Sequence, residues 1–295
     1  MSFRTPMRTI IGFLFCLLSQ LALAESSVWK VSNGSDYLYL GGTIHLLAAD
    51  DYPLPEEFDS AYKDAQTIIL ETDISAVNSP DFQAKLMAAM SYDDERTLAS
   101  VLEPEVFSDL EQFMASRQIP SLGFFAIQPW GVMLLVTMME YQRMGLLPGY
   151  GVDLHFNNRA MADNKTILGL ETPEEQLSFL ASMGEVDPNL MVKNTLQDLQ
   201  RLPEFVDLMK SSWRSGDLEA LSEYGMIEQM KADAPELYAT LISRRNDAWM
   251  AQLPGLLDRD DVVFVLVGAM HLNGDDGMLN QLRQQGYEVT QVKTR

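Results

Sequence analysis

Two of the three histidines in this 295-residue chain end the same short motif, Gly-x-x-His. The first copy is Gly42-Thr43-Ile44-His45, the second is Gly268-Ala269-Met270-His271, and each follows an apolar run. Neutral imidazole can act as a general base or as a metal ligand, and glycine lets other groups approach the backbone closely. The repeated setting predicts that His45 and His271 belong to one site, whereas a single histidine after a strand is more often a hydrogen-bonded structural residue.

Acidic side chains follow two other apolar runs. Glu71 comes after Thr67 to Leu70, and Glu171 comes after Lys165 to Leu170. If these runs are neighbouring parallel strands, their carboxyl ends meet at one edge of the sheet, where ligands bind in open α/β folds. Two imidazoles and a carboxylate with an open position form the ligand set of a hydrolytic metal site, in which bound water loses a proton near neutral pH. The pattern therefore predicts a metal site made of Glu71 and the two motif histidines.

Further polar residues near these runs have both functional and structural interpretations. Glu71 and Glu171 could instead lie at the start of a following helix, because carboxylates stabilise helix N-termini. His155 is expected on a helix that begins beside Asp153, where it would be structural or would orient a ligand residue. Arg245 is also expected on a helix, either on a solvated face or bound to the anionic transition state of a reaction.

These residues require a scaffold of alternating strands and helices. Asn33-Gly34 between Val28 to Val31 and Tyr37 to Leu40 predicts an N-terminal β-hairpin. Later strands are predicted at 67–70, 165–170, 261–267 and 287–292, and helices at about 53–64, 81–90, 103–117, 129–144, 152–163 and 276–285, with another from Pro173. Residues 185–257 are expected to be helical, with breaks near Pro188, Pro203, Gly216 and Pro235. The alternation predicts a single α/β domain with a mostly parallel central sheet flanked by helices.

The first 24 residues have the pattern of a secretory signal peptide. Arg4 and Arg8 precede the apolar stretch Ile10 to Leu21, and Ala22-Leu23-Ala24 is a processing site. The stretch is short for a membrane span, so no stable membrane anchor is expected. Cleavage after Ala24 would leave an exported domain of residues 25–295, periplasmic or secreted, without the single cysteine, Cys16.

The formal net charge of the chain is −21 at pH 7. Such a charge repels phosphate backbones and anionic lipids, so we expect neither nucleic acid nor a membrane surface as a partner. A peptide or a small molecule is the expected substrate.

Taken in order, these motifs resemble the TraB/PrgY/GumN family, whose animal members include the Tiki proteases. The similarity runs from Gly42-Thr43-Ile44-His45-Leu46 through Ile68-Ile69-Leu70-Glu71, Gly151-Val152-Asp153-Leu154-His155 and Arg245-Asn246 to Val267-Gly268-Ala269-Met270-His271. The family is characterised by two Gly-x-x-His motifs and a glutamate. The resemblance implies an α/β core, a relation to erythromycin esterases and haem-binding proteins, and metal-dependent peptidase activity with manganese or cobalt.

Together, the residues and the resemblance indicate an exported metal-dependent hydrolase, with a peptidase as the leading interpretation. His45 and His271 would bind manganese, cobalt or zinc, and Glu71 would be a third ligand or the base. Arg245 would stabilise negative charge. Residues around the ligands or the substrate would be His155, Glu171, Asp153, Gly42 and Gly268. Two alternatives remain open: a metal-free esterase that uses histidine and Glu71, and a haem- or peptide-binding protein without turnover.

Overall fold

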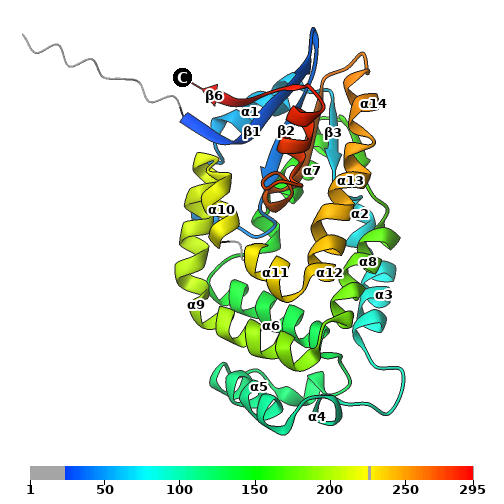
Figure 1. Ribbon diagram of the computed structural model, residues 1–295, viewed down its shortest axis with the longest axis vertical. Helices are drawn as coiled ribbons and strands as arrows, with labels where there is room; N and C mark the ends of the chain where they lie inside the picture. Colours follow the sequence, from blue (N-terminus) through cyan, green and yellow to red (C-terminus); the bar gives the residue numbers. More distant parts are fainter. Residues whose placement is uncertain (1–23, 225–226, 295) are drawn as a thin grey trace, which may run out of the picture.

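The computed structural model describes residues 24–224 and 227–294, so the predicted signal peptide lies outside the described residues except for Ala24. Within these ranges, six strands form one sheet in the order β4-β3-β5-β2-β1-β6 (Figure 1). The strands are β1 (Ala24–Asn33), β2 (Asp36–Thr43), β3 (Thr67–Leu70), β4 (Thr166–Gly169), β5 (Val263–Gly268) and β6 (Glu288–Thr294).

Most of the sheet is parallel, as predicted. Strand β5 runs parallel to both of its neighbours, β2 and β3, and β3 runs parallel to β4. The exception is β1, which is antiparallel to β2 and to β6. The predicted hairpin is confirmed: Asn33 pairs with Asp36, and Gly34 occupies the tight turn with φ +69°.

The most apolar run of the chain forms β5, a central strand of the sheet. Residues Val263 to Val267 of β5 are each 0% exposed. A strand buried on both faces reads as a continuous apolar run because helices cover both sides of a parallel sheet. The position of β5 between β2 and β3 therefore fixes which three strand ends lie next to one another.

Helices surround the sheet and extend beyond one end of it (Figure 1). They are α1 (Glu56–Asp64), α2 (Ile74–Val77), α3 (Pro80–Met90), α4 (Leu98–Val101), α5 (Pro104–Ser116), α6 (Pro129–Arg143), α7 (Val152–Ala162), α8 (Pro173–Ala181), α9 (Pro188–Ser215), α10 (Leu218–Tyr224), α11 (Ile227–Asp233), α12 (Pro235–Tyr238), α13 (Arg244–Met250), α14 (Leu253–Leu257) and α15 (Met278–Gln284). None of the described helices is both long and apolar enough to cross a membrane. The α/β class and the largely helical segment before the last strands are confirmed.

One predicted helix boundary is wrong. Helix α9 runs through Pro203 without a break. Its apolar face is buried on both sides of the proline, at Leu199, Leu202 and Val206. Interior proline costs a helix roughly 3 kcal/mol, and the burial of this continuous face outweighs that cost.

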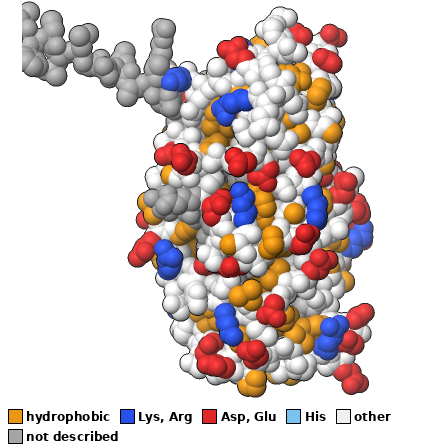
Figure 2. All heavy atoms as spheres, in the orientation of Figure 1, with side chains coloured by type: hydrophobic (Ala, Val, Ile, Leu, Met, Phe, Trp, Pro, Cys, Tyr) orange, Lys and Arg blue, Asp and Glu red, His pale blue; other side chains and the backbone are white. Residues whose placement is uncertain are grey.

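Two hydrophobic cores meet along α9. One core surrounds the sheet, and the other lies among α5, α6 and the first part of α9. Trp213 near the end of α9 belongs to the sheet core, and its indole nitrogen donates a hydrogen bond to the Gly42 carbonyl oxygen over 2.7 Å. The helical layer is thereby fixed against the strand that carries the first Gly-x-x-His motif. On the face shown in Figure 2, acidic side chains are spread over the surface with basic ones among them.

Candidate active site

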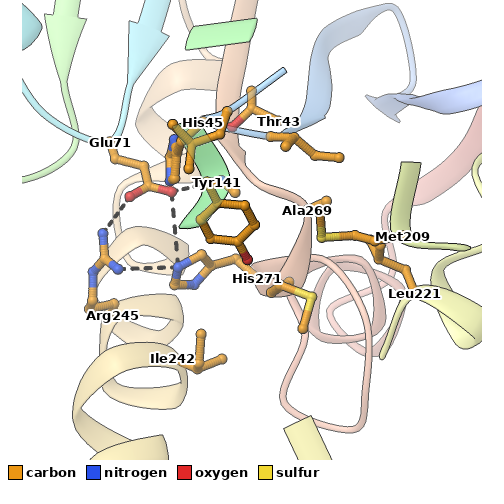
Figure 3. A pocket seen from close by; sticks show the side chains of 14 residues that line it. Thr43, His45, Glu71, Tyr141, Met209, Leu221, Ile242, Arg245, Ala269 and His271 are labelled. Atoms are coloured by element: carbon orange, nitrogen blue, oxygen red, sulfur yellow. Dashed lines mark hydrogen bonds and ion pairs between the residues drawn. The ribbon is translucent and has the colours of Figure 1, made fainter. Parts of the chain in front are cut away.

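The candidate site lies at the carboxyl ends of β2, β5 and β3. His45 follows β2 by two residues, Glu71 follows β3 directly, and His271 ends the short turn after β5. Because these three strands are adjacent and parallel, the side chains of His45, Glu71 and His271 line one cavity of about 370 Å³ (Figure 3). Helices beyond the sheet also contribute to the wall of this cavity, with Tyr141 from α6 and Met209 from α9.

His45 is held by a buried carboxylate. Its Nδ1 lies 2.7 Å from Asp153 Oδ2, and Asp153 Oδ1 accepts a hydrogen bond from the Thr43 hydroxyl at 2.6 Å. The His45 side chain is 64% exposed, which leaves Nε2 free beside the cavity. Negative charge on Asp153 raises the pKa of His45 to about 9. His45 is therefore an imidazolium at neutral pH. Its hydrogen bond from Nδ1 to Asp153 fixes the orientation of the ring.

The approach of α7 to His45 depends on Gly151. The Val152 amide donates to the Ile44 carbonyl oxygen at 3.0 Å. A Cβ atom at position 151 would lie 2.3 Å from the His45 carbonyl oxygen. Only glycine permits this contact, so Gly151 sets the distance at which Asp153, two residues later, meets the imidazole.

His271 is buried, and the amide of Asn246 defines its tautomer. The Asn246 side-chain nitrogen donates to the carbonyl oxygens of His271 and Asp276, at 3.2 and 2.9 Å. Its side-chain oxygen therefore faces His271 Nδ1 at 2.7 Å, and Nδ1 carries the proton. Burial lowers the pKa of His271 to about 3, so the ring is neutral with Nε2 as an acceptor.

Arg245 joins the acidic residues to His271. Its guanidinium donates to Glu71 Oε2 at 2.6 Å and binds Glu171 through two nitrogens, at 3.0 and 2.8 Å. Nη1 lies 3.2 Å from His271 Nε2. Figure 3 shows Arg245, Glu71 and His271 facing one another at one side of the cavity. The π-helical turn Ala239–Ser243 directly precedes α13, whose second residue is Arg245, and such distortions are frequent at functional sites.

The two carboxylates of this cluster differ in protonation. Burial alone would raise the pKa of Glu71, but the positive charge of Arg245 overrides burial and holds this pKa well below its usual range. Glu71 Oε1 also accepts the Gly268 amide hydrogen at 2.6 Å. Burial raises the pKa of Glu171 to about 7. Glu71 is thus the permanent counter-ion of Arg245.

Comparison with known proteins places this chain in a family. The model of the TraB/PrgY/gumN family matches residues 27–291. The chain belongs to the TraB/PrgY/gumN family. It is 27% identical over 252 residues to "Uncharacterized protein YbaP" of Escherichia coli (strain K12), which covers 85% of this chain and 89% of the relative. The YbaP protein of Shigella flexneri gives the same identity and coverage. No solved structure gives a significant match.

The donor types of this TraB/PrgY/gumN chain suit a divalent transition metal, but their arrangement does not. In the described part of the chain, no three His, Cys, Asp or Glu side chains are grouped so that they could hold an ion. Arg245 Nη1 faces the acceptor nitrogen of His271, and both oxygens of Glu71 already accept hydrogen bonds. A cation at His271 would meet the guanidinium charge at close range.

The two motif glycines have different environments in this family member. A Cβ at Gly268 would lie 3.2 Å from Glu71 Oε1 and 3.8 Å from His45 Nε2, inside the space between these groups. A Cβ at Gly42 would instead press on Leu272 and on the Ala269 backbone. Gly268 therefore keeps the site open, whereas Gly42 allows close packing behind it.

The structure does not bring His155 to the cavity. Its ring packs against Tyr52 and Phe156, with centroids 5.3 and 4.9 Å away. Conversely, the sequence did not indicate the roles of Asn246 and Thr43. Asn246 orients the His271 imidazole directly, and Thr43 orients His45 indirectly by donating a hydrogen bond to Asp153. Both are next to residues that the sequence singled out, but neither has a spacing that indicates a partner.

Proposed function

We propose that this protein is a hydrolase in which His45, held by Asp153, activates water for attack on a carbonyl group. One observation carries the proposal: Asp153 binds His45 Nδ1 at 2.7 Å, while Nε2 remains free at a cavity that Glu71 and Arg245 also line. A carboxylate that holds an imidazole in one tautomer and stabilises its protonated form is a recurrent arrangement in hydrolytic catalysis.

In this scheme, His45 takes a proton from the attacking water and later gives it to the leaving group. The neutral form of His45, which predominates above its pKa of about 9, accepts a proton at Nε2 as the water oxygen bonds to the carbonyl carbon. The imidazolium returns that proton to the leaving oxygen or nitrogen when the bond to carbon breaks. Arg245 stabilises the negative charge that develops on the carbonyl oxygen, and Glu71 positions Arg245 through their ion pair at 2.6 Å.

A metal-dependent form of the same hydrolysis is the second candidate. His45 and His271 each have Nδ1 bound to an oxygen, at 2.7 Å in both cases, so that Nε2 is directed away from that partner. Histidines that bind metals commonly donate their other ring N–H to an oxygen in this way, but here Arg245 Nη1 lies 3.2 Å from His271 Nε2. Glu71 would complete a set for manganese, cobalt or zinc, and the ion would supply acidified water. Arg245 would first have to leave His271.

The test uses the purified protein without residues 1–24, a panel of p-nitrophenyl esters and N-acyl p-nitroanilides, and a matched pair of histidine variants. We expect His45→Gln to lower kcat/KM by about 10²–10⁴-fold, the usual contribution of a general base. His155→Gln is the control, because His155 lies outside the cavity, and it should retain activity. Thermal melts check that both variants fold.

Exhaustive chelation then separates the candidates. Activity that survives chelation supports the metal-free scheme. Activity that is lost on chelation and restored by one metal supports the second candidate and overturns the first. Equal activity of His45→Gln and the parent protein, or no turnover of any compound, overturns the proposed function and favours a binding protein.

We further propose that the protein is exported, in a periplasmic or secreted form that begins at Glu25. The support is the pattern of Arg4, Arg8 and Ala22-Leu23-Ala24. N-terminal sequencing of the protein isolated from cells measures the cleavage position.

A further inference from the structure

The cluster of His45, Glu71 and Arg245 lies between two cavities. The first cavity, described above, has a volume of about 370 Å³, and the second has a volume of about 350 Å³. All three residues line both cavities. A bond that reacts at this cluster would therefore have space for a substituent on each side.

The first cavity is apolar away from the cluster. Met209, Leu221, Ile242 and Met270 line it, and methionine side chains adapt their shape to an apolar ligand. Figure 3 shows the Tyr141 ring within the group of lining side chains. This cavity suits an uncharged apolar group.

The second cavity contains an unpaired buried hydroxyl. Thr72 follows Glu71, is 4% exposed and lines this cavity. In the described part of the chain, its Oγ1 is one of the few buried polar side-chain atoms without a hydrogen-bond partner. Burying an unpaired hydroxyl is unfavourable, so a rotation about the Cα–Cβ bond of Thr72 that brings Oγ1 to a polar group of a ligand in this cavity would be favourable. Gln176 lines the same cavity and adds a second polar side chain.

We propose that the substrate is an uncharged ester or amide whose apolar acyl group occupies the first cavity and whose other side binds Thr72 in the second. This assignment rests on the proposed function, because the reacting carbonyl is placed at His45. An anionic substituent is disfavoured, since the chain carries a net charge of −21 and would repel it.

The experiment measures binding by calorimetry with two matched series of amides that are stable during the titration. One series is N-(2-hydroxyethyl) butanamide, hexanamide and octanamide, and the other is the corresponding N-propyl amides. In the parent protein we expect affinity to rise roughly fourfold for each added CH₂ until the cavity is full. The hydroxyethyl compounds should bind about fivefold more tightly than the propyl compounds, the worth of one hydrogen bond.

Two variants and their controls locate each effect. Ile242→Phe fills the first cavity and should abolish the dependence on chain length, whereas Leu208→Phe, exposed on α9 beside Met209, should preserve it. Thr72→Val keeps the side-chain shape and should abolish the preference for the hydroxyethyl compounds. Thr166→Val, on the exposed edge strand β4, should retain that preference.

The melting temperature of Thr72→Val distinguishes a ligand-binding role of Thr72 from a structural one. A structural role predicts a lower melting temperature, and a ligand-binding role does not. Thr72→Val should melt at the same temperature as the parent protein or higher, because it removes an unpaired buried hydroxyl, while it weakens binding. A lower melting temperature, or an undiminished hydroxyethyl preference, overturns the role of Thr72. Absence of any chain-length dependence in the parent protein overturns the apolar assignment, even if Ile242→Phe does not fold.

The binding series is independent of turnover, so the two proposals fail separately. Ester hydrolysis that requires His45, without the expected binding pattern, overturns only the assignment of the cavities. The expected binding pattern without any hydrolysis overturns the hydrolase and leaves the two cavities as a ligand-binding site.

Discussion

At the scale of single residues, the two copies of Gly-x-x-His place chemically different imidazoles at one cavity. His45 is 64% exposed and paired with Asp153, which raises its pKa to about 9. His271 is buried against Asn246 and Arg245, and its pKa falls to about 3. Identical motifs therefore supply one side chain that can exchange a proton and one that stays neutral.

The pH dependence of hydrolysis should report the His45–Asp153 pair. A general base works in its unprotonated form, so kcat/KM should rise as the pH increases through about 9, the pKa of His45. Asp153→Asn removes the negative charge that raises this pKa. We expect the midpoint of the profile to move down toward the ordinary value for histidine, about 6.5, and the plateau to fall by about 10²–10⁴-fold.

Asp163→Asn, at the opposite end of α7, is the control for this profile. Its midpoint should coincide with that of the parent protein. An unchanged midpoint in Asp153→Asn would show that another group supplies the titration, and His45 would lose its role as the base.

The sequence predicts residues of this site most directly where a strand end specifies them. His45, Glu71 and His271 each follow an apolar run, and the parallel order of three strands brings them together. Asn246 has no such signal. Its role depends on how α13 packs against the sheet, which local sequence does not encode.

At the scale of elements, α7 acts as a support for the reacting imidazole. Its first turn approaches β2 so closely that a side chain at Gly151 would overlap the His45 carbonyl group. Asp153 then accepts hydrogen bonds from both Thr43 and His45. The first Gly-x-x-His motif and the start of α7 form one structural unit, although they are far apart in the sequence.

Gly151→Ala should therefore lower activity strongly, although it adds only one methyl group. The added methyl group pushes α7 away from His45, and overpacking of this kind costs about 1–3 kcal/mol of stability. A displacement of about 1 Å at a catalytic group lowers rates by roughly 10²-fold. Urea denaturation and ester hydrolysis measure the two effects.

Gly149→Ala is the matched control, because a Cβ there meets nothing within 4 Å. It should leave stability and activity close to the parent values. Full activity of Gly151→Ala would show that the site tolerates a shift of α7 and would contradict the role given to this contact.

The elements were more predictable from sequence than the site. The strand predicted at 67–70 matches β3, because a four-residue apolar run between polar residues leaves little freedom. The break predicted at Pro203 failed, since burial of Leu199, Leu202 and Val206 outweighs the local preference of proline. Local signals decide an element unless tertiary packing opposes them.

At the scale of the whole molecule, α9 connects the helical layer to the sheet. Its first part packs in the core shared with α5 and α6, and Trp213 packs in the core around the sheet. Ser27 donates to the Trp213 carbonyl oxygen at 2.7 Å, and the Trp213 indole donates to Gly42. The cavity has walls from both parts, so its shape depends on this connection.

Trp213→Phe tests whether the two cores behave as one unit. The change removes the donor to the Gly42 carbonyl oxygen, and a buried acceptor left unpaired costs about 1–3 kcal/mol. Because α9 contributes to both cores, we expect one cooperative urea transition, shifted to lower urea, and reduced hydrolysis. Far-UV circular dichroism and activity should change together across the transition.

Leu208→Ala, on an exposed position of the same helix, should stay within about 0.5 kcal/mol of the parent protein. Two separate transitions, with activity lost in only one, would instead show that the helical layer unfolds independently of the sheet and its site.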